Sequence, residues 1–112
     1  MKGIPDESRE KSVITLLNNV ETNQTSPVFS FGTGRKWIQS NILGTGAVSA
    51  TVDFYGNNVN SNLNGVLLAT STLSGTNTDV TGADLPAEPS YIYCTLSNIS
   101  GTNAAVTITV GV

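Results

Sequence analysis

The feature of this sequence that most constrains its fold is a period-two alternation of apolar and polar side chains. In residues 47–55 every second side chain is apolar, from Val48 to Phe54. Residues 91–96 and 104–110 alternate in the same way. Successive side chains of a β-strand point to opposite faces, so each of these segments is predicted to be a strand with one buried face.

Further strands are expected between these segments. Residues 66–73 begin with an apolar run on both faces, which favours a more central strand. Weaker patterns at 13–17, 28–31 and 37–42 bring the number of predicted strands to about seven. Many short strands with Gly-rich turns and no long helical pattern predict an all-β fold, a single antiparallel β-sandwich of jelly-roll type.

Glycine-containing turn sequences separate the predicted strands. Ser-Gly-Thr-Asn occurs twice, at 74–77 and 100–103, and glycine supplies the positive φ that a hairpin turn needs. The second copy lies between the patterns at 91–96 and 104–110, so these two strands are expected to form a hairpin.

Composition agrees with an all-β domain. Ser, Thr, Asn and Gly make up 50 of the 112 residues, and only 12% are charged. Thr and Val suit a half-buried pleated surface and Asn suits tight turns, whereas a disordered chain usually carries more charge.

The charges are concentrated near the amino terminus. Six of the 13 charged side chains lie within the first 11 residues, and no Lys or Arg follows Lys36. We therefore expect a short charged N-terminal arm, residues 1–11, before a β-sandwich domain, residues 12–112. A net charge of −3 without clustered cations argues against a nucleic-acid partner. No apolar run is long enough to span a membrane and no secretory signal is visible, which favours cytoplasmic synthesis.

The clustered charges are candidate partner-binding residues. The arm would order on a partner through charge-assisted hydrogen bonds, or else remain an ordinary solvated terminus. The candidates are Lys2, Asp6, Glu7, Arg9, Glu10, Lys11, Arg35 and Lys36.

The residues offer little for catalysis. Histidine is absent, so a Ser or Cys nucleophile has no usual base, and Cys94 alternates with apolar positions as a buried structural thiol would. Asp79, Asp84 and Glu88 lie in a predicted loop, 76–89, but match no calcium-loop spacing and are interpreted as solvated carboxylates. We expect no enzymatic activity and no cofactor.

Two segments leave sugar recognition open. Trp37 follows Arg35 and Lys36, and this combination could stack on a sugar or contact an acidic partner. We favour the alternative in which Trp37 enters the core while the two charges stay in solvent. Residues 55–65 contain five Asn and no charge, and form either a sugar-binding loop or, as we favour, a plain loop.

The second half carries a resemblance. The segments ATVDFYGNN, GVLLATSTLSGTNT and SYIYCTLSNISGTNAAVTITVGV, in that order, resemble small β-sandwich virion structural proteins of tailed bacteriophages, of the head decoration or cement type. The resemblance covers roughly residues 45–112. It implies a non-enzymatic virion protein that stabilises the outer capsid surface, with the major capsid protein as partner and assembly in the bacterial host cytoplasm.

Strand edges without Lys point to assembly as well. Lys on an edge strand guards against edge-to-edge pairing, and this body has none after position 36. Closure, the N-terminal segment or a neighbouring subunit must cover the edges, so we expect a homo-oligomer, a trimer or dimer. The alternative function is a ligand-recognition module, a carbohydrate-binding or fibre/tail sandwich that uses Trp37, Tyr55 and the Asn-rich loop.

Overall fold

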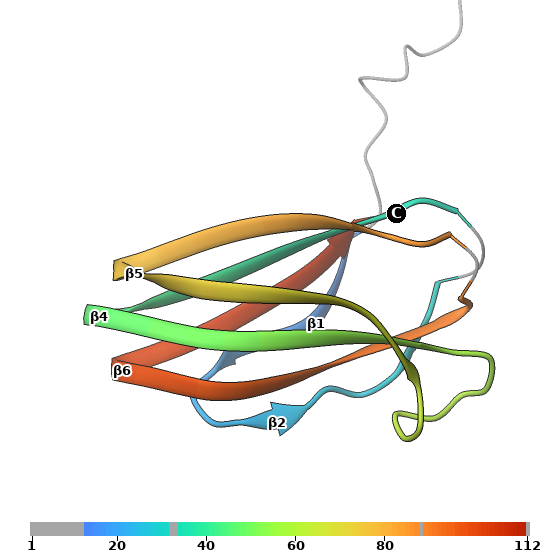
Figure 1. The fold of residues 1–112 in the computed structure, drawn as a ribbon, viewed down its shortest axis with the longest axis horizontal. Helices are drawn as coiled ribbons and strands as arrows, with labels where there is room; N and C mark the ends of the chain where they lie inside the picture. The colour runs from blue at the N-terminus through green and yellow to red at the C-terminus, as the bar shows by residue number, and fades with distance from the viewer. Residues whose placement is uncertain (1–12, 32–33, 88, 112) are drawn as a thin grey trace, which may run out of the picture.

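The computed structural model describes residues 13–31, 34–87 and 89–111, and within them the chain forms six strands and no helix. The strands are β1 (Val13–Val20), β2 (Gln24–Thr25), β3 (Phe29–Ser30), β4 (Lys36–Asn57), β5 (Val66–Leu85) and β6 (Tyr91–Gly111). All pairs are antiparallel, in the order β1-β6-β4-β5, with β2 and β3 also paired to β6 (Figure 1). The all-β class and the antiparallel pairing are confirmed, while jelly-roll connectivity stays a prediction.

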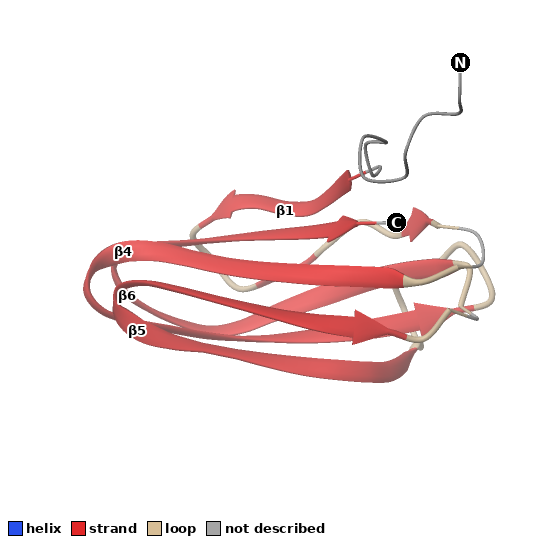
Figure 2. Ribbon diagram, turned by 90° about the horizontal axis from the view of Figure 1, so that it is seen from above, coloured by secondary structure: helices blue, strands red, loops and turns tan. Residues whose placement is uncertain are grey.

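The three long strands turn back on themselves. A straight strand of the length of β4, 22 residues, would reach about 70 Å at roughly 3.3 Å per residue, more than the longest extent of the molecule, 51 Å. Figure 2 shows the long strands curving round at one end of the molecule, where they pass from one layer to the other. The shortest extent, 17 Å, accommodates two sheets packed about 10 Å apart.

The pairing registers define the two layers. The first layer contains β1, residues 36–43 of β4, 78–85 of β5 and 105–111 of β6. The second layer contains β2, β3, residues 47–57 of β4, 66–76 of β5 and 91–100 of β6. Inward-facing side chains of both layers, such as Ile38 and Val106 of the first and Phe54 and Ile92 of the second, form one buried core. The chain is therefore a β-sandwich whose two layers share their strands.

The bends in β4, β5 and β6 lie side by side. Thr45 pairs with Thr102 across β4 and β6, and Ala47 pairs with Thr76 across β4 and β5. Backbone φ is positive at the bends, at Gly46, Asn77, Gly101 and Asn103. Both copies of Ser-Gly-Thr-Asn thus mark the places where strands change layer.

The predicted hairpin between residues 91–96 and 104–110 is wrong, because both segments belong to the single strand β6. Positive φ at Gly101 and Asn103 bends the strand, and each half pairs with β4 instead of with the other half. In the same way 37–42 and 47–55 merge into β4, so six strands replace the predicted seven.

The predicted central position of residues 66–73 is also wrong. These residues begin β5, which lies at the edge of the sheet, and the side chains of Val66 and Leu67 are 70% and 54% exposed. The apolar run borders a surface pocket instead of filling the core.

Candidate functional site

Lys36 and Trp37 have exchanged the positions expected of them. Lys36 is only 1% exposed, whereas Trp37 is 47% exposed, so the interpretation with Trp37 in the core and the charge in solvent is wrong. Ile38 and Ile42 face the core and fix the register of β4, which turns Lys36 inward and Trp37 outward. Gly82 of the neighbouring strand lies under the indole, since a Cβ at this position would clash with the Trp37 ring.

The buried ammonium of Lys36 ties two connecting segments together. Its Nζ donates hydrogen bonds of 3.0 Å to the carbonyl oxygens of Gly34 and Ala87. Charge-assisted bonds of this kind compensate for removing a cation from water. Lys36 therefore holds the ends of the layers together and is not a surface contact for a partner.

Replacing Lys36 by methionine is expected to lower the free energy of unfolding by about 2–3 kcal/mol, because the carbonyl oxygens of Gly34 and Ala87 lose the buried ammonium that donates to them. Arg35→Met is the matched control. Its guanidinium side chain is 89% exposed, 3.7 Å from the Asp84 carboxylate, and its loss should change stability by no more than about 0.5 kcal/mol. Urea denaturation followed by circular dichroism measures both; equal losses would contradict the structural role of Lys36.

Of the candidate partner-binding residues, Arg35 is the one that the described part of the chain places at the surface. Lys2, Asp6, Glu7, Arg9, Glu10 and Lys11 lie outside the described residues, as does the rest of the arm.

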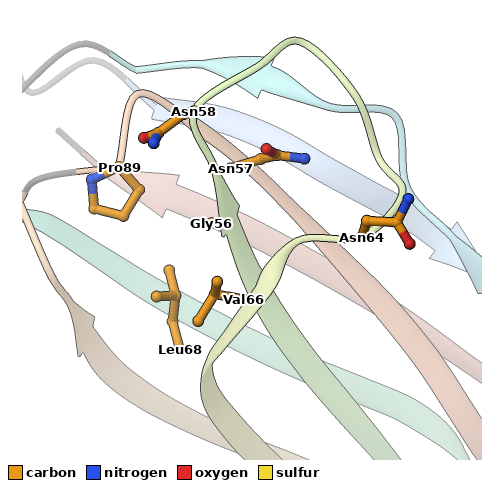
Figure 3. Close-up of a pocket in the computed structure, with 7 residues that line it drawn as sticks. All are labelled: Gly56, Asn57, Asn58, Asn64, Val66, Leu68 and Pro89. Atoms are coloured by element: carbon orange, nitrogen blue, oxygen red, sulfur yellow. The ribbon is translucent and has the colours of Figure 1, made fainter.

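A pocket of about 290 Å³ lies at the end of the sandwich opposite the bends (Figure 3). Gly56 forms its floor, and a Cβ at this position would lie 2.8 Å from the Pro89 ring and 2.9 Å from Leu68. Because Lys36 holds Ala87, it also helps to position Pro89 two residues later. The full lining is Gly56, Asn57, Asn58, Asn64, Val66, Leu68 and Pro89.

The Asn-rich loop is held largely by its own amides. Asn57 Nδ2 donates to the carbonyls of Ser61 and Leu63 at 3.0 and 3.1 Å, and its Oδ1 accepts from Val59 N. The Tyr93 hydroxyl accepts a 2.9 Å hydrogen bond from Gly65 N, and its ring stacks on Tyr55 with 5.1 Å between centroids.

Asn58 and Asn64, by contrast, have no side-chain hydrogen bond to other described residues, and both border the pocket. Figure 3 shows Asn58 beside Pro89, and Asn64 on the far side of the cavity.

Trp37 and Tyr55 do not belong to one site. Trp37 points outward from the first layer, where it pairs across strands with Asp84. Tyr55 points outward from the second layer, where it pairs across strands with Tyr93. The two rings therefore lie on opposite faces of the sandwich. No sequence pattern predicted that Pro89 would border this pocket, although Gly56 at an inward position of the alternating pattern is a signal of close backbone approach.

Two of the three carboxylates predicted in a loop, Asp79 and Asp84, lie on a strand, since β5 extends to Leu85. Glu88 lies outside the described residues. Asp79 accepts hydrogen bonds from the backbone N–H groups of Ser74 and Val80, which fastens the bend. Within the described ranges, no three His, Cys, Asp or Glu side chains are grouped closely enough to hold a metal ion.

Burial of Cys94 is confirmed. The residue is inaccessible to solvent, and burial raises the pKa of its thiol to about 12. Ser26 exchanges backbone and side-chain hydrogen bonds with it: Ser26 N donates to Cys94 O at 2.8 Å, and Cys94 N donates to Ser26 Oγ at 3.0 Å. The group is enclosed as a structural thiol.

No protein-family model matches this chain, and no curated protein sequence is significantly similar to it. Solved structures do resemble it. The SPBc2 prophage-derived protein YomS superposes with a TM-score of 0.59 at 16% identity, over 91% of this chain and 92% of that one. VP2 in the infectious bursal disease virus subviral particle gives a TM-score of 0.51 at 10% identity, over 92% of this chain and 32% of that one.

These likenesses concern the fold. The whole β-sandwich is similar to a prophage-derived protein along nearly the full length of both chains, and to about a third of a protein from a viral particle. No helix within 13–31, 34–87 or 89–111 is long and apolar enough to cross a membrane.

Proposed function

We propose that this chain is a non-enzymatic structural protein of a bacteriophage particle. The observation that carries the proposal is the likeness to a prophage-derived protein over 91% of this chain and 92% of that one. The likeness extends over nearly the whole of both chains. The likeness to VP2 of a subviral particle, with a TM-score of 0.51, is further support.

Within the particle, the role that we propose is head decoration: the chain, made in the bacterial host cytoplasm, binds the major capsid protein on the outer capsid surface and stabilises it. The first layer offers a suitable surface. Trp37, Leu43 and Val80 all point outward from it and are exposed, and Gly82 keeps the region around the indole flat. Exposed apolar side chains are common in protein contacts, and tryptophan often dominates their energetics.

Reconstitution tests the role and the surface together. Purified chain is added to particles that lack it, and the bound fraction is titrated by quantitative mass spectrometry. Trp37→Ala is expected to weaken binding about tenfold or more, as removal of a central aromatic anchor does. Leu67→Ala, an exposed apolar residue on the opposite face, is the control and should bind like wild type. Unimpaired binding of Trp37→Ala would reject this surface, and no binding of wild type would reject head decoration.

The charged arm is the second proposed contribution to attachment. Deleting residues 1–11 should leave the sandwich folded but weaken attachment to particles, and added salt should weaken attachment of the full chain, since exposed ion pairs are screened within roughly 10 Å at 0.1 M. Circular dichroism monitors the fold and the same titration monitors binding. Full occupancy by the truncated chain would assign attachment to the sandwich alone.

The pocket favours ligand recognition as a second candidate function. The pocket combines the amides of Asn58 and Asn64 with the apolar side chains of Val66, Leu68 and Pro89, a combination that suits the hydroxyls and apolar face of a sugar. Trp37 has no part in this site, because it lies on the first layer's outer face.

A glycan array of wild type and Asn64→Gly tests this candidate. Asn64 has φ of 62°, so glycine keeps the backbone conformation while removing the amide. Binding is expected for wild type and lost for Asn64→Gly, whereas Asn60→Ala, in the same loop but outside the pocket lining, should retain it. An array without any bound glycan, or unchanged binding by Asn64→Gly, would reject sugar recognition at this pocket.

A further inference from the structure

We infer that two copies of this chain join along β5, and that this contact exists apart from any capsid. β5 forms the edge of both layers: residues 78–85 end the first layer and residues 66–76 end the second. Because the strand turns back at its bend, the two edges lie on the same side of the sandwich, where Figure 1 shows both halves of β5 outside β4. Among the described strands, only β4 pairs with β5.

This edge lacks the usual protection against strand pairing. Its 20 residues contain no Lys, Arg or Pro, and its pairing with β4 is irregular only at Leu68, near its beginning, and at the bend. Its two carboxylates are engaged within the chain. Asp79 accepts backbone hydrogen bonds at the bend and Asp84 lies 3.7 Å from Arg35. A long strand without Lys, Arg or Pro therefore presents a row of backbone groups along one whole side of the sandwich, and these groups pair with no other described strand.

A second copy is the occupant that matches this side. A single extended peptide would cover one of the two stacked edges, whereas another copy brings two edges with the same separation. The two halves of β5 run in opposite directions. A two-fold axis that is parallel to the strands, or one that is perpendicular to the layers, therefore places each β5 edge antiparallel to a β5 edge of the second copy. An isologous contact of this type closes with two subunits, which selects a dimer over a trimer.

Size and shape agree with such a contact. The side of the sandwich measures 51 by 17 Å, and its projected area of about 870 Å² is comparable to the roughly 800 Å² per partner of a stable interface. Four of the inward side chains along this rim are small, namely Ala69, Ser71, Thr81 and Ala83, while the larger Leu73 and Leu85 are buried in the core and do not project from the edge. Val66, Leu67 and Val80 add exposed apolar surface beside the edges.

Sedimentation velocity of the full chain at micromolar concentration tests the inference. Wild type should sediment as a dimer, at twice the monomer mass of 11.6 kDa. The double variant Thr72→Lys, Val80→Lys places one cation on each exposed half of the β5 edge and should sediment as a monomer. Thr15→Lys, Gln24→Lys adds the same charge to exposed positions of β1 and β2 on the other side, and should remain a dimer.

Hydrogen exchange of wild type gives a second readout that needs no variant: amides of β5 should gain protection as concentration rises, while amides of β1 should not. A monomeric wild type, or a β5 double variant that stays dimeric, would overturn the inference. If wild type is monomeric but a chain lacking residues 1–11 dimerises, then the arm covers the edge in the full chain, and the inference is wrong. None of these measurements involves a particle, so dimerisation and capsid attachment succeed or fail separately.

Discussion

Replacing Gly101 by alanine is expected to lower the free energy of unfolding by about 3 kcal/mol or more. Gly101 has φ of 125°, a conformation that side chains rarely adopt. An added Cβ would also lie 2.7 Å from the Ala47 carbonyl oxygen and 2.9 Å from Val48 Cγ1. The obstacle is partly the backbone of β4 at its own bend, so relief requires moving a neighbouring strand. Chemical denaturation followed by far-ultraviolet circular dichroism measures the loss.

Gly46→Ala separates the two contributions to this loss. Gly46 also has positive φ, 75°, but nothing lies within 4 Å of a Cβ built there. Alanine at this position should lower the free energy of unfolding through backbone strain alone, by about 1–2 kcal/mol. If the two variants lost equal stability, close contact between the bends of β4 and β6 would not be what requires glycine at position 101.

Raising the pH above 9 is expected to destabilise the protein more than it destabilises a Cys94→Ala variant. The thiol has an ordinary pKa of 9.0, and burial raises its pKa to about 12, partly offset by the hydrogen bond with Ser26. Between these values the unfolded chain releases the thiol proton while the folded chain keeps it. The contribution is fully present below pH 9 and declines by about 1.4 kcal/mol per pH unit above it, to about 4 kcal/mol at most.

The alanine variant isolates this effect because it differs from wild type only in the side chain at position 94. The free energy of unfolding is measured by urea titration at several pH values from 8 upward. The difference between wild type and Cys94→Ala should change steadily above pH 9. A constant difference would mean that Cys94 ionises as easily in the folded protein as in the unfolded chain.

The alternation of side chains was enough to predict much of the fold. From Val48 to Phe54 every second residue is buried, as the pattern requires, and Cys94 lies inside with its alternating neighbours. The alternation of side chains could not predict the bends in the long strands. Asn103 with φ of 56° and Gly101 suit a hairpin turn and a strand bend equally well, and the choice depends on β4 lying alongside both halves of β6.

The surface was harder to predict than the core. Lys36 is buried because its ammonium finds the Ala87 carbonyl 51 residues away, and no local pattern reveals such a partner. Inward Lys36 forces Trp37 outward, so one long-range contact reverses the expected roles of both residues. The pocket likewise depends on Pro89, which the connection between β5 and β6 brings over Gly56.

The proposal that this chain is a structural component of a bacteriophage particle is tested most directly by electron cryomicroscopy of particles produced with and without it. The account predicts density for a two-layered β-sandwich on the outer capsid surface, in contact with the major capsid protein, and no such density in particles that lack the chain. Identical density in both preparations, with no copy of the chain in the purified particles, would contradict it.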